Sequence, residues 1–275
     1  MVLVTRESGR ICRYSARHRS WAQGRRVTVL VETTMSSLPP ELFDLVVDHL
    51  DDEPATLKTC CVVSKSWIPR ARKHLFACVE FQASRAHIAL WKKAFPDPSN
   101  SPAHHTRNLS VYGFQTITAA DAGAGGWIRT FCNVVHLELA RMNRPSLLPF
   151  CGLLTTVRSL SLIHTPIEVF DLVCSFPLLE NLTLVALFPT SDEDGWNAPM
   201  TPPKLTGTLD LKMFGKARPV AHKLLDLPGG LHFSEINATF FDDDAKSVTD
   251  LVSGCSETLE SLTVTYQSAF PIPLL

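Results

Sequence analysis

The sequence predicts an α/β protein in which three short helices come before a long run of strand and helix units. Between residues 36 and 80, Leu42, Val46 and Leu50 recur at every fourth position, which places them on one face of a helix. After residue 104, short segments alternate between apolar and polar side chains, which is typical of strands with one buried side. With 275 residues, of which 45% are apolar, the chain is long enough to bury a sizeable core.

Residues 1–35 form an arginine-rich leader. They contain seven arginines and two glutamates, and we interpret them as a disordered basic segment without a function. Two alternatives are a mitochondrial transit peptide and an arm that binds an acidic partner or nucleic acid. Because Met35 stands directly before the helical segment, a further interpretation is that the leader is a gene-model extension upstream of the true start.

The sequence of residues 36–80 predicts three short helices packed on one another. Acidic residues followed by a proline at 51–54 end the first helix and open the second, and Ser64 is a suitable cap for the third. So short a segment buries only a small core by itself, although it is rich in apolar residues. One set of these side chains can face inward, and the remainder indicates contact with a partner.

The order and spacing of residues in this segment match a known motif. The match is carried by Leu38, Pro39, Glu41, Leu42, Val46, Leu50, Leu57, Val63, Ser64, Lys65, Trp67, Leu75 and Phe76. The segment closely resembles an F-box, which docks on the small adaptor of cullin-based ubiquitin ligases, in the wording common among fungal F-box proteins. The alternative is an ordinary helical subdomain whose apolar face packs on its own chain.

The resemblance implies that the adaptor, and through it the cullin, is a partner of this chain. It assigns the adaptor contacts to Leu38, Pro39, Leu42, Leu57, Val63 and Trp67. Trp67 is assigned equally to the core of the helical segment and to the contact, because tryptophan serves both roles.

Residues 81–103 predict a fourth helix and a linker. Residues 83–95 place Ile88, Trp91 and Phe95 on one helical face. Three prolines between positions 96 and 102 then end the helix.

In residues 104–275 the template V/L-x-x-L-x-L recurs with a long period. Steps of 28, 23, 22, 27, 27 and 26 residues separate its central residues, which are Leu109, Leu137, Leu160, Leu182, Leu209, Ile236 and Leu262. This period predicts an irregular leucine-rich-repeat-like solenoid. The Asn or Cys ladder typical of such repeats is missing, which leaves a flat mixed sheet with helices on one side as the alternative. The chain ends soon after a strand without a polar cap, which indicates either a truncated stack or an exposed, adhesive end.

Strand positions that flank the buried leucines face the opposite side of the predicted stack. In a curved stack this side is concave and is the natural surface for a protein substrate. The candidate substrate contacts are Tyr112, His136, Glu138, Asp210, Lys212, Glu235 and Asn237. The alternative is a solvated sheet face without a ligand.

Motifs for nucleotide binding, acyl transfer or metal binding are missing from the sequence, so we expect no cofactor and no metal. The eight cysteines form no CxxC pair, which favours a reducing compartment. The net charge of −1 argues against a dedicated nucleic-acid binder, and no apolar run is long enough for a membrane helix.

The resemblance to an F-box implies a non-enzymatic substrate-recognition subunit of an SCF-type ubiquitin ligase, which we expect in the cytoplasm or nucleus. One alternative is an adaptor-binding F-box protein with a structural or regulatory role and no substrate delivery. A second alternative is an enzyme whose site the sequence does not reveal.

Overall fold

A computed structural model describes residues 6–7, 10–11, 39–82, 84–113, 126–142, 155–188, 203–212, 218–241 and 245–267. The chain divides into two compact units, residues 1–80 and 81–275, and each is described by itself. Within the basic leader, β1 (Arg6–Glu7) and β2 (Arg10–Ile11) form an antiparallel pair, and Leu38 lies outside the described residues.

Three short helices and one 3-10 turn make up the helical part of the first unit, which is called the helical unit below. They are α1 (Pro40–Asp48), α2 (Pro54–Val63), η1 (Lys65–Trp67) and α3 (Ile68–Leu75). Each α-helix has a proline in its first turn, where a missing amide costs no intrahelical hydrogen bond.

The helical unit has a small core. Its fully buried members are Val47, Leu57, Cys60 and Ala71, which come from all three α-helices. Four partly buried side chains surround them: Leu50, Cys61, Trp67 and Leu75. Because only four residues are fully buried, each one carries a large share of the unit's stability.

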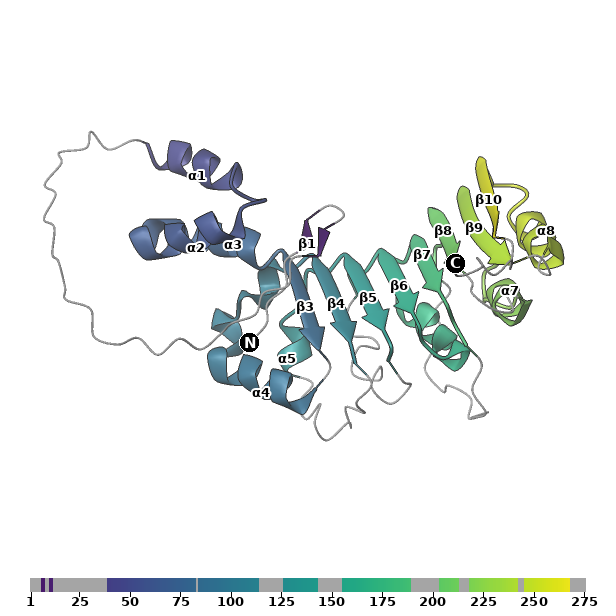
Figure 1. Ribbon diagram of the computed structural model, residues 1–275, viewed down its shortest axis with the longest axis horizontal. Coiled ribbons are helices and arrows are strands. Elements are labelled where there is room, and N and C mark those ends of the chain that lie inside the picture. The colour runs from purple at the N-terminus through teal and green to yellow at the C-terminus, as the bar shows by residue number, and fades with distance from the viewer. Residues whose placement is uncertain are drawn as a thin grey trace, which may run out of the picture. The chain divides into compact units, whose positions relative to one another are not determined.

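The second architectural feature is one eight-stranded sheet whose strands are ordered as in the sequence (Figure 1). From β4 to β10, every neighbouring pair is parallel. The strands are β3 (Cys78–Gln82), β4 (Asn108–Tyr112), β5 (His136–Ala140), β6 (Ser159–Ile163), β7 (Asn181–Val185), β8 (Thr208–Lys212), β9 (Glu235–Phe241) and β10 (Ser261–Gln267).

The predicted fold, a three-helix F-box followed by an irregular leucine-rich-repeat-like solenoid, is wrong. The structure has a single eight-stranded parallel sheet with helices, which is an α/β fold. The sheet includes β3, which crosses the predicted boundary between residues 80 and 81. The reason is physical: the repeated template shows only that each strand has one buried face, and this pattern does not determine the curvature of the sheet that the strands form.

Helices and 3-10 turns connect the strands. They are α4 (Arg85–Ala94), η2 (Pro98–Asn100), η3 (Pro102–His105), α5 (Gly126–Arg129), η5 (Ile167–Ser175), α7 (Arg218–Leu225) and α8 (Ala245–Gly254). Parallel strands require such crossovers, because a tight turn can join only antiparallel neighbours. Figure 1 shows α7 beside α8, and these two helices contact each other.

Alternate strand residues build the core of this α/β unit. On β4 to β8, the template leucine and the residue two positions later are buried, while their neighbours are half-buried or exposed. An aromatic cluster of Phe81, Trp91 and Phe131 joins β3 and α4 to the segment after α5, with ring centroids 5.0 to 5.9 Å apart. The sheet thus has one buried apolar face and one polar face.

Three strands end in the same way. Arg141, His164 and Ala186 directly follow β5, β6 and β7, and their φ angles of 55, 49 and 51° lie in the left-handed region. The amide of each donates a 2.8 Å hydrogen bond to the carbonyl oxygen of the last residue of the next strand. This repeated turn extends the ladder by one bond at an equivalent point after each of the three strands.

Candidate functional site

The helical unit carries five large apolar side chains on its surface, which are called the exposed apolar set. Leu42, Leu45 and Val46 lie on α1 at positions i, i+3 and i+4, and Val62 and Val63 end α2. Their exposed fractions range from 45 to 87%. Because an exposed apolar side chain gains free energy when it leaves water, this set favours association with another molecule.

The residues that the F-box resemblance assigned to adaptor contact lie in two kinds of place. Pro39, Leu42 and Val63 are exposed, as a direct contact requires. Leu57 is 1% exposed and lies in the core, so in this conformation it supports the surface from beneath and touches no partner. Trp67 packs against the core, and its ring centroid is 5.4 Å from that of Phe43. Leu38 lies outside the described residues.

Three exposed residues were absent from the predicted contacts: Leu45, Val46 and Val62. The sequence did indicate that some of these residues are exposed, because α1 contains more apolar residues than one helical face can bury. Periodicity alone did not show which face turns inward. Leu42, Val46 and Leu50 were predicted to share a face, but Leu50 packs against the core while the other two are exposed.

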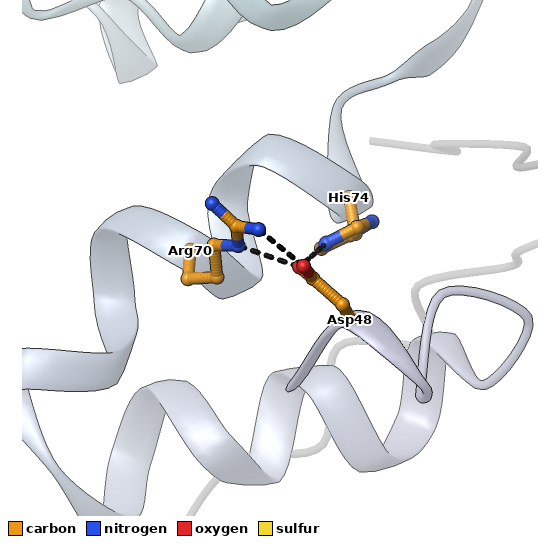
Figure 2. A network of polar contacts seen from close by, with 3 residues as sticks. All are labelled: Asp48, Arg70 and His74. Atoms are coloured by element: carbon orange, nitrogen blue, oxygen red, sulfur yellow. Dashed lines mark hydrogen bonds and ion pairs between the residues drawn. The ribbon is translucent and has the colours of Figure 1, made fainter. Parts of the chain in front are cut away.

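A polar network fixes α1 to α3 in the helical unit (Figure 2). Asp48, the last residue of α1, accepts two hydrogen bonds from the guanidinium of Arg70. His74, one turn further along α3, donates from Nε2 to Asp48 Oδ1 over 2.7 Å, since a carboxylate can only accept. One half-buried carboxylate therefore holds two groups of the neighbouring helix.

The hydrogen bonds from Arg70, followed by the one from His74, lower the pKa of Asp48 well below its ordinary range. The same pairing with Asp48 raises the pKa of Arg70. Since the folded-state pKa of Asp48 lies below the unfolded value of about 3.9, the ionised carboxylate stabilises the fold. That contribution is fully present above the unfolded pKa and is lost as the pH falls toward the folded value.

Replacing Asp48 with asparagine is expected to lower the melting temperature of the helical unit by about 3–6 °C at pH 7, because the charged pairing with α3 is lost. The difference in melting temperature between this variant and the unmodified chain should become smaller as the pH is lowered from 5 to 2, because the native carboxylate also loses its charge there. Hydrogen exchange of α1 and α3 amides along a temperature series would measure both quantities. Asp52→Asn, at an exposed acid in the turn between α1 and α2, is the matched control. A difference that stays constant across this pH range would contradict the prediction.

The polar face of the sheet is the second candidate surface. All seven predicted substrate residues lie on it, at strand positions whose side chains are half-buried or exposed. In the parallel register they fall into three rows that cross the strands: His136 and Glu235 in the first, Glu138, Asp210 and Asn237 in the second, and Tyr112 and Lys212 in the third.

Hydrogen bonds hold several side chains of the polar face in place. Lys212 Nζ lies 3.0 Å from Asp210 Oδ2 on the same strand. Glu235 accepts from Asn237 Nδ2 over 2.9 Å and from Thr208 Oγ1 over 3.1 Å. Asn181 Oδ1 accepts from the amide of Thr208 over 2.8 Å. The carboxylates of β8 and β9 are therefore pre-positioned, which lowers the entropy lost when a polar ligand binds.

The described residues contain no group of three or more His, Cys, Asp or Glu side chains that could hold a metal ion. Across the same ranges, no helix combines the length and the apolar character needed to cross a membrane.

No protein-family model matches the chain, and no curated protein is similar enough to match it.

Proposed function

We propose that this protein is a non-enzymatic substrate-recognition subunit of an SCF-type ubiquitin ligase that acts in the cytoplasm or nucleus. Its helical unit binds the adaptor, and the polar face of its sheet binds a protein substrate. The observation that carries this proposal is the exposed apolar set of the helical unit. Five large apolar side chains face water there, beside a core with only four fully buried members.

In the helical unit, one set of apolar side chains forms the core and another lies on the surface, and this separation supports adaptor binding. Its inward side chains already form a closed core around Leu57, so the exposed apolar set is not needed to hold the unit together. Leu42 and Val63 are members of that set, and both belong to the resemblance to an F-box. Burying such side chains on a partner contributes about 25 cal/mol for each Å² of apolar surface removed from water.

The polar face of the sheet suits a protein substrate. Its rows carry both signs of charge together with hydroxyl and amide groups, and hydrogen bonds already hold several of these side chains. Fixed polar groups of this kind contribute orientation and specificity more than raw affinity. The surface acts by holding a substrate, without a bond being made or broken on this chain.

Proximity is then the mechanism. A substrate bound to the sheet and an adaptor bound to the helices belong to one complex, so the substrate lysine meets the conjugating enzyme at a raised effective concentration. An approach that would otherwise be bimolecular becomes intramolecular, and this accelerates transfer.

A pull-down of purified adaptor and cullin by the full chain tests adaptor binding. Replacing Leu42 and Val63 by glutamate is expected to reduce the retained adaptor at least about tenfold, since two charges would be buried in an apolar contact. Leu90→Glu is the matched control, because Leu90 on α4 is 43% exposed and Leu42 is 45% exposed. The control should retain adaptor as the unmodified chain does.

Two results would overturn the proposal. One is a folded, unmodified chain that retains no adaptor at micromolar concentration. The other is an equal loss in Leu42→Glu/Val63→Glu and in Leu90→Glu, because that would show a general response to added charge. Circular dichroism of each variant establishes that the helices are intact.

A further inference from the structure

Among the strands that the structure describes, β10 differs from the others of the sheet in the exposure of its apolar side. The template residues of the six preceding template strands, from Leu109 to Ile236, are at most 1% exposed. On β10 the equivalent residue, Leu262, is 45% exposed, and Tyr266 on the same side is 53% exposed. Their partners in the register, Ile236 and Phe240 on β9, are buried. The apolar side of the sheet therefore continues onto β10, but in the described part of the chain its side chains are exposed there.

In the described part of the chain, one edge of the β10 backbone is also unpaired, on the side away from β9. Among the described residues, β10 is at the end of the strand order and pairs only with β9. Its sequence, SLTVTYQ, has no charge and no proline, and it is rich in β-branched and aromatic residues. Edge strands are usually protected by charge, proline or a bulge, because an unprotected edge recruits another strand. The opposite edge strand, β3, carries Glu80.

The sequence of β10 is complementary to itself when two copies run antiparallel about Val264. In that register Leu262 lies opposite Tyr266 of the second copy, and Val264 lies opposite Val264. On the other side of the strand, Thr263 lies opposite Thr265. Aromatic–aliphatic and Thr–Thr pairs are stabilising across antiparallel strands, and no charges oppose each other.

We propose that β10 pairs with β10 of a second copy of this chain, so that a two-fold axis joins two sheets into one continuous sheet. A two-fold axis perpendicular to the sheet keeps both apolar sides on the same face, so each copy covers Leu262 and Tyr266 of the other. The contact is isologous and closed, which gives a dimer and not a fibre. Seven residues per copy make a small interface, which is typical of a weak, transient contact.

Sedimentation equilibrium of the full chain at about 1–100 µM tests the dimer. The unmodified chain is expected to approach twice the 30.4 kDa chain mass as its concentration rises. Thr263→Lys/Thr265→Lys sets like charges against each other twice across the axis and should raise the dimer dissociation constant at least about tenfold. Thr263→Lys/Thr265→Glu sets opposite charges there and should restore the dimer. Both positions are exposed. The two variants both carry Thr263→Lys, so they differ only in the charge introduced at position 265.

A cross-linking measurement determines the register between the two β10 strands, and it does not depend on the lysine variants being folded. Val264 lies on the two-fold axis, so Val264→Cys brings two thiols within disulfide reach. Thr265→Cys, one position along, does not face its own copy. Oxidation should give at least about fivefold more covalent dimer from Val264→Cys than from Thr265→Cys. A chain that stays monomeric at every concentration overturns the proposal, and so does a dimer that is indifferent to the two lysines or a reversed cross-linking order.

Discussion

Replacing Trp91 with alanine is expected to lower the free energy of unfolding of the α/β unit by about 3–5 kcal/mol. Trp91 is 3% exposed and comes from α4. Its ring centroid lies 5.0 Å from that of Phe81 on β3 and 5.6 Å from that of Phe131. The substitution removes a large buried ring from a cluster that joins an edge strand, a helix and a loop, and the three cannot all close the cavity.

Urea unfolding followed by circular dichroism would measure this loss. Leu90→Ala is the matched control on the same helix, because Leu90 is exposed, and its effect should stay within about 0.5 kcal/mol. Trp91→Phe keeps an aromatic ring and should cost clearly less than Trp91→Ala. Equal effects at positions 90 and 91 would mean that the aromatic cluster does not hold α4 to the sheet.

Strand positions could be predicted from the sequence, because the strand pattern is local. Each central residue of the template, from Leu109 to Leu262, lies within a strand of the structure. The alternation of sides has a period of two residues, so a segment of five residues already shows it. The same alternation puts the seven candidate substrate residues on the side of the strands opposite the buried leucines, and their role in binding a substrate stays a prediction.

The arrangement of those strands was not predicted correctly. β3, with the sequence CVEFQ, begins only three residues after α3, and it was predicted as part of the helical segment and linker. A five-residue strand becomes stable only through its neighbours in the sheet, so its own residues give a weak signal. The predicted solenoid failed for a related reason, since one-sided burial of each strand does not specify the curvature or closure of the sheet.

For the helical unit, the sequence showed an excess of apolar residues but not their division between core and surface. The F-box resemblance assigned both Leu57 and Leu42 to adaptor contact, yet Leu57 is buried and Leu42 is exposed. Which leucine turns inward depends on the angles between the helices, and the angle between α1 and α3 is set by tertiary contacts such as the Asp48 network. Helical periodicity contains no information about that angle.

Replacing Leu57 with alanine is therefore expected to unfold the helical unit, while Leu42→Ala leaves it folded. Removing a fully buried leucine costs about 2.7–5 kcal/mol, and a core of this size supplies only about 3–5 kcal/mol in total. Leu42 is exposed, so its replacement should change the free energy of unfolding by less than about 0.5 kcal/mol. Hydrogen exchange of α1 to α3 amides would report the difference, with the sheet amides of the same chain as the internal reference.

The same pair of variants separates two ways of losing a partner. Both should retain less adaptor, but Leu57→Ala loses it because the unit that presents the surface is unfolded, whereas Leu42→Ala loses a contact from a folded unit. Protection of the α1 and α3 amides distinguishes the two causes, since only the first variant should lose it. If Leu57→Ala kept full protection and still lost the adaptor, Leu57 would itself be a contact residue, and α2 would have to turn outward when the partner binds.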